Sequence, residues 1–246
     1  MYDDPVSRLE FSWARSRSVP IVENGEPVVP ASLCPDRVVV LPQYYLEGIE
    51  GALPELYLRE GVLRRLVSAA GFLPAGHRIV LMDGWRSTRL QNALFSAYVE
   101  RLREKSPNAL DESLREAASQ FVALPSCDPA RPSPHLTGGA VDCTIADADG
   151  VMLDMGSGFD ETSQHSITRW LEDRVEAGET LSGKDVCVLR NRRMLHTIMR
   201  GAGFTNYPEE WWHFDFGNQN WALLTEAANA FYGPSSPEFA WRNPDK

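Results

Sequence analysis

Apolar residues recur at helical spacing along several stretches of the chain. Between Glu55 and Ala70 they fall three or four positions apart on one face, and Gly71 follows as a C-terminal cap. Ser87 or Thr88 can cap the start of a second such helix. Including that second helix, the same spacing predicts helices over residues 89–103, 114–122, 186–200 and 221–231.

Shorter stretches have the pattern of strands. Apolar runs or alternation predict strands over residues 28–29, 38–41, 78–82, 140–145 and 210–216. In the fourth of these, Val141, Cys143 and Ile145 face the core, which turns Asp142 and Thr144 to the opposite side. This mixture of elements predicts an α+β fold, although periodicity alone does not fix the strand order.

Polar residues on or beside the last two strands have the side chains of a metal site. His135, Asp142 and His213 offer two imidazoles and one carboxylate, and three protein ligands leave one tetrahedral position of a zinc ion free for water. Glu210, three residues before His213, has the chemistry of a base that takes a proton from that water. The pattern therefore favours a metal-dependent hydrolytic site.

Each half of this set is common by chance. A loop histidine with a nearby aspartate, or a lone Glu-x-x-His, is usually ordinary structure. The alternative function is a non-catalytic binding domain with a structural zinc, and such a site is usually closed by four protein ligands. Asp215 and Cys143 are the nearest candidates for a fourth ligand, but both have better structural explanations. Three ligands and a base together favour catalysis.

Composition and charge exclude other classes of protein. With 246 residues, of which 43% are hydrophobic, the chain can bury a sizeable core as one domain or as one domain with insertions. A formal net charge of -10 argues against nucleic acid as a partner and disfavours docking on anionic lipid or wall polymer. The four cysteines form no Cys-x-x-Cys pair, so they do not have the pattern of a zinc finger.

The sequence also indicates a compartment. Its opening, Met1 to Pro5, has neither a basic start nor an apolar run, so we expect no secretory signal. No stretch is apolar enough to cross a membrane. We therefore expect a cytoplasmic protein with no membrane partner, in which Cys34, Cys127, Cys143 and Cys187 stay reduced.

The two ends of the chain have little regular pattern. Aromatic residues near the N-terminus could reach a substrate pocket, but packing is the simpler explanation for Phe11, Trp13, Tyr44 and Tyr45. After the last predicted helix, residues 234–246 form a tail with little structure of its own.

The two polar fragments resemble a known superfamily. Ser-x-His-x-x-Gly-x-Ala-x-Asp, starting at Ser133, followed by Glu-x-Trp-His, resembles the zinc D,D-peptidases, which include D-alanyl-D-alanine dipeptidases, D,D-carboxypeptidases and some phage endolysins. Further stretches resemble the dipeptidase branch, which contains the vancomycin-resistance enzyme: residues 83–86, 155–160 and 191–193. The resemblance covers about 38 to 216. Ser87 departs from it, because the family usually has proline there.

The resemblance implies both a fold and an activity. It implies one domain over 1–246, in which a small, mainly antiparallel sheet carries the zinc site and helices pack on one side. The implied reaction is hydrolysis of D-alanyl-D-alanine to two D-alanines with a single zinc ion, in cell-wall precursor metabolism or glycopeptide resistance. The alternative is a D,D-carboxypeptidase or endolysin acting on peptidoglycan, which needs export or a wall-binding module; the sequence shows neither.

The resemblance also assigns roles to residues. Arg86 stabilises the oxyanion of the reaction, Asp160 binds the free amino group of the dipeptide, and Ser133 contributes to the substrate site. The residues alone leave simpler roles open, namely a salt bridge between Arg86 and Asp83, a turn or cap carboxylate at Asp160 and a turn hydroxyl at Ser133. The oligomeric state and the strictness for D-alanine at each position stay open.

Overall fold

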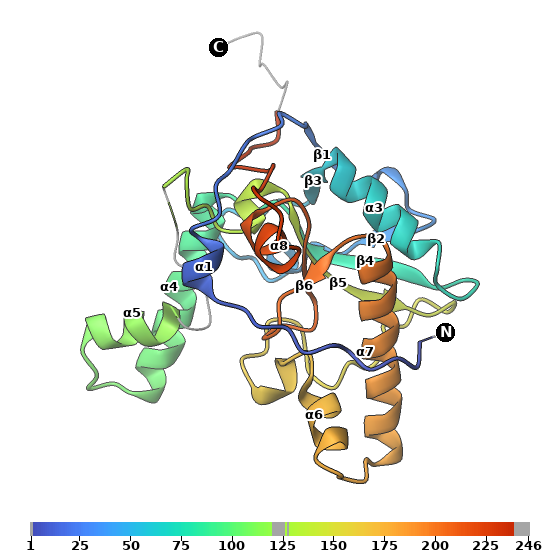
Figure 1. The fold of residues 1–246 in the computed structure, drawn as a ribbon. Coiled ribbons are helices and arrows are strands. Elements are labelled where there is room, and N and C mark those ends of the chain that lie inside the picture. The colour runs from blue at the N-terminus through green and yellow to red at the C-terminus, as the bar shows by residue number, and fades with distance from the viewer. Residues whose placement is uncertain (1, 120–125, 127, 239–246) are drawn as a thin grey trace.

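A five-stranded sheet organises the structure, which is a computed structural model that describes residues 2–119, 126 and 128–238 (Figure 1). The strand order is β2-β4-β5-β7-β6. β2 runs parallel to β4, and the other neighbouring pairs are antiparallel. The prediction of a mainly antiparallel sheet in an α+β fold is confirmed. The strands are β2 (Val38–Val40), β4 (Arg78–Asp83), β5 (Ala140–Ala146), β6 (Thr205–Asn206) and β7 (His213–Asp215).

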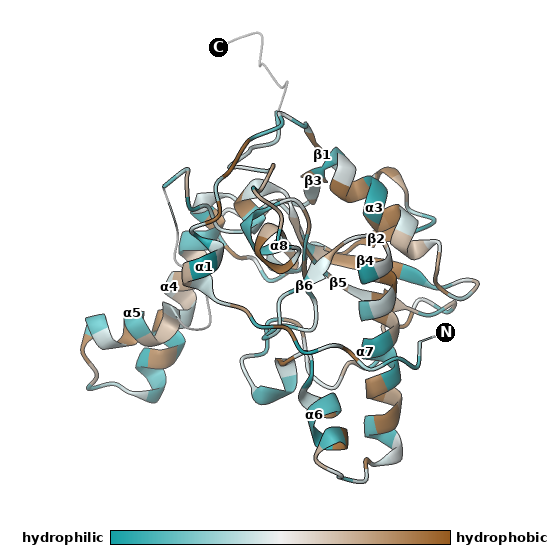
Figure 2. Ribbon diagram, viewed as in Figure 1, coloured by the Kyte–Doolittle hydropathy of each residue, from teal (hydrophilic) through white to brown (hydrophobic). Residues whose placement is uncertain are grey.

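One face of this sheet carries the hydrophobic core. Val141, Cys143 and Ile145 on β5 are fully buried, as their alternation predicts. They belong to the same apolar cluster as Leu66 of α3 (Glu60–Ala70) and Leu195 of α7 (Gly183–Gly201). Both helices have an apolar stripe and a polar stripe (Figure 2). The opposite face of the sheet is left for the polar residues of β5 and β7.

The helix predicted over 55–70 starts five residues later than expected. Residues 57–59 form strand β3 (Tyr57–Arg59), which pairs antiparallel with β1 (Val28–Pro30) as a separate two-stranded sheet. Pairing with a distant strand therefore overrides the helical spacing that these residues share with α3. Gly71 caps the helix as predicted.

A second apolar cluster joins two helices away from the main core. α4 (Thr88–Lys105) packs on α5 (Asp111–Ser119) through Phe95, Tyr98 and Leu114. Ser87 caps α4, because its hydroxyl oxygen accepts a hydrogen bond from the amide of Leu90. Residues 120–122 of the helix predicted over 114–122 lie outside the described residues.

The last predicted helix is shorter than the apolar pattern indicates. Instead of covering 221–231, α8 (Gln219–Leu224) ends near Glu226, whose φ is 57°. The chain then turns back, so that the amides of Phe231 and Tyr232 both donate to the carbonyl oxygen of Gly217. These apolar side chains pack against the core from an irregular segment. The prediction of a helix to residue 231 is wrong because that packing competes with helical continuation.

None of the helices in the described ranges is long and apolar enough to cross a membrane.

The remaining short elements connect the sheets and the longer helices. These elements are α1 (Trp13–Ser16), α2 (Gln43–Leu46), α6 (Trp170–Glu176), and the 3-10 turns η1 (Ala31–Leu33), η2 (His135–Thr137) and η3 (Gln164–Ser166).

Gly217 tests the packing of the C-terminal segment. Its φ is +71°, and a Cβ atom there would lie 2.5 Å from the rings of Phe231 and Tyr232. We expect Gly217→Ala to lower the free energy of unfolding by about 2–4 kcal/mol, through backbone strain and overpacking. Urea denaturation measures the change. Gly183→Ala is the matched control, since nothing lies within 4 Å of its added Cβ; equal effects would contradict the packing described here.

Candidate metal centre and active site

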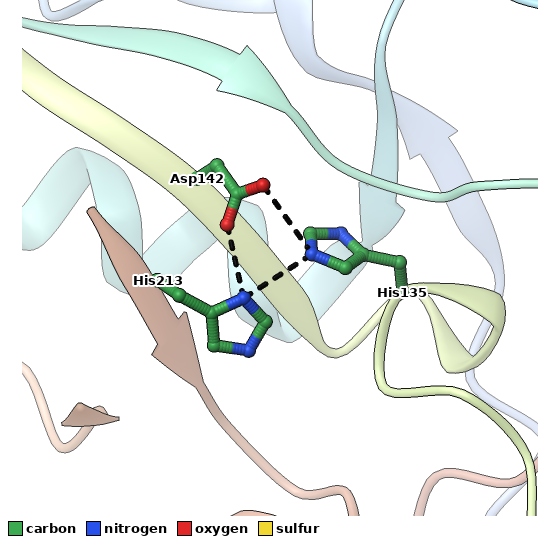
Figure 3. Close-up of side chains that lie close together, drawn as sticks. All are labelled: His135, Asp142 and His213. Carbon is green, nitrogen blue, oxygen red and sulfur yellow. Dashed lines mark hydrogen bonds and ion pairs between the residues drawn. The ribbon is translucent and has the colours of Figure 1, made fainter. Parts of the chain in front are cut away.

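The register between two strands brings the first pair of site residues together. Asp142 on β5 and His213 on β7 are direct cross-strand partners. His135 reaches them from η2, which ends at Gly138 in the left-handed conformation, with φ of 70°. β5 begins two residues later, so a short turn and two neighbouring strands deliver all three side chains (Figure 3).

The three side chains converge on one point. The distance from His213 Nδ1 to Asp142 Oδ1 is 3.0 Å, and that from His135 Nε2 to Asp142 Oδ2 is 3.4 Å. The two inner nitrogens, His135 Nε2 and His213 Nδ1, are 3.2 Å apart. All three residues are buried, and one ligand atom from each lies within 4.8 Å of the others. The sequence predicts this set, and the structure brings it together.

Both histidines use their outer nitrogens for other contacts. Nδ1 of His135 lies 2.7 Å from the carbonyl oxygen of Gly84, and Nε2 of His213 lies 3.2 Å from Oδ1 of Asp215. Carbonyl and carboxylate oxygens are acceptors, so each outer nitrogen carries the proton. When the inner nitrogens are unprotonated, their lone pairs and the carboxylate of Asp142 face one shared point. A cation at this point satisfies all three groups at once.

Charge at the centre favours a cation as well. Burial lowers the pKa of His213, but the carboxylates of Asp215 and Asp142 outweigh burial and raise it well above its usual value. For Asp142 burial acts in the opposite direction and raises the pKa. The neighbouring imidazoles of His135 and His213 outweigh burial, so the pKa of Asp142 lies below its usual value. The centre is therefore a buried place that stabilises positive charge.

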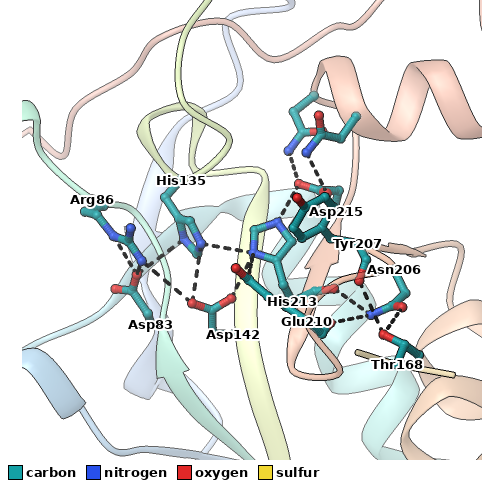
Figure 4. A network of polar contacts seen from close by, with 12 residues as sticks. Asp83, Arg86, His135, Asp142, Thr168, Asn206, Tyr207, Glu210, His213 and Asp215 are labelled. Atoms are coloured by element: carbon teal, nitrogen blue, oxygen red, sulfur yellow. Dashed lines mark hydrogen bonds and ion pairs between the residues drawn. The ribbon is translucent and has the colours of Figure 1, made fainter. Parts of the chain in front are cut away.

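Asp215 has a structural role, as the sequence predicts, rather than that of a fourth ligand. It lies behind His213 and is fully buried (Figure 4). Its carboxylate accepts hydrogen bonds from Asn218 Nδ2 at 2.5 Å and Asn220 Nδ2 at 3.1 Å. Spacing could have indicated this position, because residues two apart on a strand share a face.

Arg86 joins the site from the end of β4. Its Nε and Nη2 donate to Oδ2 of Asp83 at 2.9 and 2.6 Å, and its Nη1 donates to Gln91 at 3.0 Å. Nη2 also lies 3.7 Å from Oδ2 of Asp142. Burial opposes its charge, but the carboxylates of Asp83 and Asp142 raise its pKa further above the usual range. Arg86 is therefore both paired with Asp83 and held, charged, beside the metal centre.

Glu210 lies in the turn before β7. The strand predicted over 210–216 is confirmed only for 213–215. Asn206 holds this turn by donating to the carbonyl oxygens of Glu210 at 3.0 Å and His213 at 2.9 Å. The side chain of Glu210 is 27% exposed, with Oε2 at 3.8 Å from Nδ1 of His213. Burial raises its pKa to about 8, against the opposing effect of His213.

Asp160 lies in a loop and lines a pocket together with Arg86 and Glu210. Its backbone is left-handed, with φ of 59°. The preceding Phe159 packs between Tyr44 and Trp212, with ring centroids 5.5 and 5.7 Å away. The carboxylate is open to the pocket, but the protein around it raises its pKa to about 6 by desolvation, with Arg86 opposing. The loop thus presents a carboxylate near the metal centre.

The motif at 191–193 fixes that loop rather than touching the centre. Arg192 donates to the carbonyl oxygens of Met155 at 2.7 Å and Ile167 at 2.8 Å, and also to that of His165. Asn191 donates to the carbonyl oxygen of Asp154 at 2.8 Å. Both ends of the segment that carries Asp160 are therefore attached to α7.

A pocket of about 330 Å³ opens over these residues. Ser133 lines it together with His135, and both are buried. The pocket also includes residues that sequence reasoning left unassigned or gave only a packing role. Their aromatic character was the available signal, and they are Trp13, Tyr44, Tyr98 and Tyr207. Trp212, next to His213 in the sequence, lines the pocket as well. By contrast, Tyr45 is 49% exposed.

Two imidazoles and a carboxylate around one point, with a glutamate and an arginine beside them, are typical of a metal-dependent hydrolase. Residues 59–231 match the peptidase M15 family model, described as D-ala-D-ala dipeptidase. A D-alanyl-D-alanine dipeptidase of Synechocystis sp. is 32% identical over 218 residues, which cover 83% of this chain and 87% of the relative. The chain belongs to this dipeptidase family.

Further relatives carry the same name. D-alanyl-D-alanine dipeptidase of Escherichia coli is 34% identical over 105 residues, which cover 42% of this chain and 49% of the relative. That of Enterococcus faecium is 29% identical over 143 residues, which cover 56% of this chain and 62% of the relative. These matches span about half to two thirds of the relatives.

Two solved structures are more distant. A vancomycin resistance D,D-pentapeptidase, VanY, in complex with Zn(II) is 18% identical, with a TM-score of 0.39 over 74% of this chain and 85% of that chain. VanYB in complex with D-alanine-D-alanine is 17% identical, with a TM-score of 0.40 over 70% of this chain and 77% of that chain. At this distance the comparison extends neither to side chains nor to substrates.

Asp215 tests the contacts behind the centre. We expect Asp215→Asn to weaken zinc binding by about 10- to 100-fold, because His213 loses the carboxylate that holds its outer proton. Titration of zinc against a competing chelator measures the affinity without any assay of activity. Asp149→Asn, in an exposed turn, is the control that leaves the affinity unchanged. Unchanged affinity in Asp215→Asn would contradict the assignment of the inner and outer nitrogens.

Proposed function

We propose that the protein hydrolyses the dipeptide D-alanyl-D-alanine to two D-alanines with one zinc ion. The ion is held by Nε2 of His135, Nδ1 of His213 and the carboxylate of Asp142. The observation that carries the proposal is the convergence of these three atoms, while the outer nitrogens already have acceptors. The relatives named D-alanyl-D-alanine dipeptidase support the choice of substrate.

The donor set fits a catalytic zinc ion. Two imidazole nitrogens and one carboxylate oxygen are ligands that zinc accepts, and three protein ligands leave a position open to the pocket. Within the described ranges, the cluster that could hold a metal contains only these three residues. Cys143 is buried on the core side of β5, and Asp215 is bonded elsewhere. When bound, zinc polarises the substrate carbonyl and lowers the pKa of water to about 7.

Glu210 moves the proton in the proposed reaction. A carboxyl whose pKa is about 8 exchanges a proton readily near neutral pH. It takes a proton from the attacking water and returns it to the leaving amine. Its position 3.8 Å from the inner nitrogen of His213 brings it beside the centre, and burial supplies the raised pKa that the second transfer requires.

Arg86 stabilises the negative charge that develops on the carbonyl oxygen. Its guanidinium is fixed by Asp83 and Gln91 before substrate arrives, so little reorganisation accompanies the reaction. The 3.7 Å contact with Asp142 keeps it next to the ligand atoms.

Asp160 and Ser133 bind the substrate. The amino group of a free dipeptide is a cation, and a carboxylate open to the pocket pairs with it. Ser133, which lines the same pocket two residues before His135, contributes a hydroxyl to the substrate site. Recognition of the free amino group supports a dipeptide substrate over a longer peptide.

We also propose that residues 1–246 act as one domain with a core at about 38–216. The segments outside that core contribute to it: Trp13 lines the pocket, and Tyr232 packs into the main apolar cluster. We also propose a cytoplasmic location, in which the thiols of Cys34, Cys143 and Cys187 stay reduced; Cys127 lies outside the described residues.

Release of D-alanine from D-Ala-D-Ala tests the function. L-Ala-L-Ala, N-acetyl-D-Ala-D-Ala and a pentapeptide ending in D-Ala-D-Ala are assayed alongside, before and after chelation and with zinc restored. We expect rapid release from the free D,D-dipeptide only, lost on chelation and recovered with zinc. Cleavage of the pentapeptide would instead indicate a carboxypeptidase, and no cleavage with zinc bound would indicate a binding domain.

Glu210→Gln tests the proton transfer. We expect kcat to fall at least about 100-fold, because general acid-base catalysis by a positioned side chain contributes about 10²- to 10⁴-fold. Zinc stoichiometry should stay at one ion per chain, since Glu210 is not among the ligands. Glu209→Gln, on the preceding residue and exposed, is the control with unchanged kcat. If Glu210→Gln kept most of its activity, the base would have to be another residue.

A further inference from the structure

The N-terminal segment forms one wall of the active-site pocket. Trp13 and Arg17, on α1 and at its C-terminal cap, line the same pocket as His213 and Glu210. Both lie before residue 59, where the match to the family model begins. This wall is therefore a feature of the present chain for which the family model gives no assignment.

Hydrogen bonds tie α1 to the metal centre. Ser16 is buried, and its hydroxyl donates to Oδ1 of Asn220 at 2.6 Å. Asn220 Nδ2 donates to Asp215 at 3.1 Å, and Asp215 accepts the outer proton of His213. An unbroken polar path thus runs from α1 to a proposed zinc ligand, so Trp13 and Arg17 have a defined position relative to the centre.

The segment before α1 is anchored independently. Val6 is 3% exposed, and its amide donates to Oε1 of Glu172 on α6 at 3.0 Å. The carbonyl oxygen of Val6 accepts a hydrogen bond from Arg169. Attached at both ends, the stretch that carries Trp13 has little freedom to leave the pocket.

Trp13 lies on the side of the pocket where the leaving group must be. Its Nε1 donates to the hydroxyl of Tyr207 at 3.2 Å, and the two rings are 5.4 Å apart. The ring of Tyr207 is 5.9 Å from that of His213, and Glu210 lies 3.8 Å from the same histidine. Glu210 returns the proton to the leaving amine, so the carboxy-terminal residue of the substrate lies on this side.

Arg17 has a charge without an acidic partner in the described part of the chain. Its guanidinium lies 5.4 Å from the centre of the Trp13 ring. It forms no ion pair with any carboxylate among the described residues. Arg86, in the same pocket, is paired with Asp83. Arg101 also lines the pocket without an ion pair to a described carboxylate, but its charge acts on Asp160, the carboxylate proposed to bind the ammonium group. An arginine that lines a substrate pocket and lacks a carboxylate is suited to bind one from the ligand.

We propose that Trp13 and Arg17 form the subsite for the carboxy-terminal residue of the substrate. Arg17 pairs with the free carboxylate, and Trp13 covers the adjoining methyl group. This proposal rests on the proposed function and deepens it, because the dipeptide is then recognised at both ends, its ammonium by Asp160 and its carboxylate by Arg17. A substrate without a free carboxylate loses the second contact.

Substrates with and without the carboxylate test the subsite. Kinetics of Arg17→Gln, Arg17→Lys and Arg15→Gln are measured with D-Ala-D-Ala and with D-alanyl-D-alaninamide, whose carboxylate is blocked. We expect Arg17→Gln to raise KM for the dipeptide by about 10- to 100-fold, the loss of one hydrogen bond to a charged group, and to leave KM for the amide unchanged. Arg17→Lys should recover part of the loss. Arg15→Gln is the matched control on the exposed side of α1.

Two results would overturn the subsite. One is an equal change in KM for both substrates, which indicates a structural effect of Arg17; the other is no change for either. A binding measurement separates a failure of the subsite from a failure of the proposed function. Calorimetry measures the binding of D-Ala-D-Ala to Glu210→Gln, with and without Arg17→Gln. Weaker binding in the double variant supports the subsite even if the wild-type chain cleaves nothing, and equal binding overturns it.

Discussion

The register between β5 and β7 is the constraint on which the site depends. Asp142 lies directly opposite His213, while their neighbours Val141 and Phe214 face the core and are almost fully buried. A slip of one residue would exchange the two faces and bury the ligands in apolar surroundings. The same packing that stabilises the sheet therefore fixes the separation of two ligand atoms.

A layer of polar contacts behind the strands completes what the register begins. Gly84 and Asp215 accept the outer protons of the two histidines, so the inner nitrogens are left to share a cation with Asp142. Asn218 and Asn220 hold Asp215 in turn. Buried carboxylates are costly without such partners, and here the cost is offset by hydrogen bonds and by the proposed cation. Fold stability and metal affinity are thus coupled in this part of the molecule.

Local pattern in the sequence was sufficient for much of this arrangement. The alternation around Asp142 correctly separates a core face from a polar face, and the residues of the metal centre could be selected because their types and spacing are restrictive. Where local spacing competes with a distant partner, it fails. Residues 57–59 pair with β1 instead of extending α3, and the chain after Leu224 packs its aromatic residues without a helix.

The pocket walls were less accessible to sequence reasoning for a physical reason. Trp13 and Tyr207 are 194 residues apart, yet they share a hydrogen bond, and no periodicity records such a contact. The role of Asp215 similarly depends on which nitrogen of His213 faces it. Residue type indicates the chemistry, whereas tertiary contacts decide which atoms perform it.

A crystal structure with zinc, read by anomalous scattering at the zinc edge, tests the central claim most directly. The expected result is one peak per chain, about 2.0–2.2 Å from Nε2 of His135, Nδ1 of His213 and a carboxylate oxygen of Asp142, with a position open to the pocket. A peak elsewhere, or a fourth protein ligand that closes the site, would contradict the account.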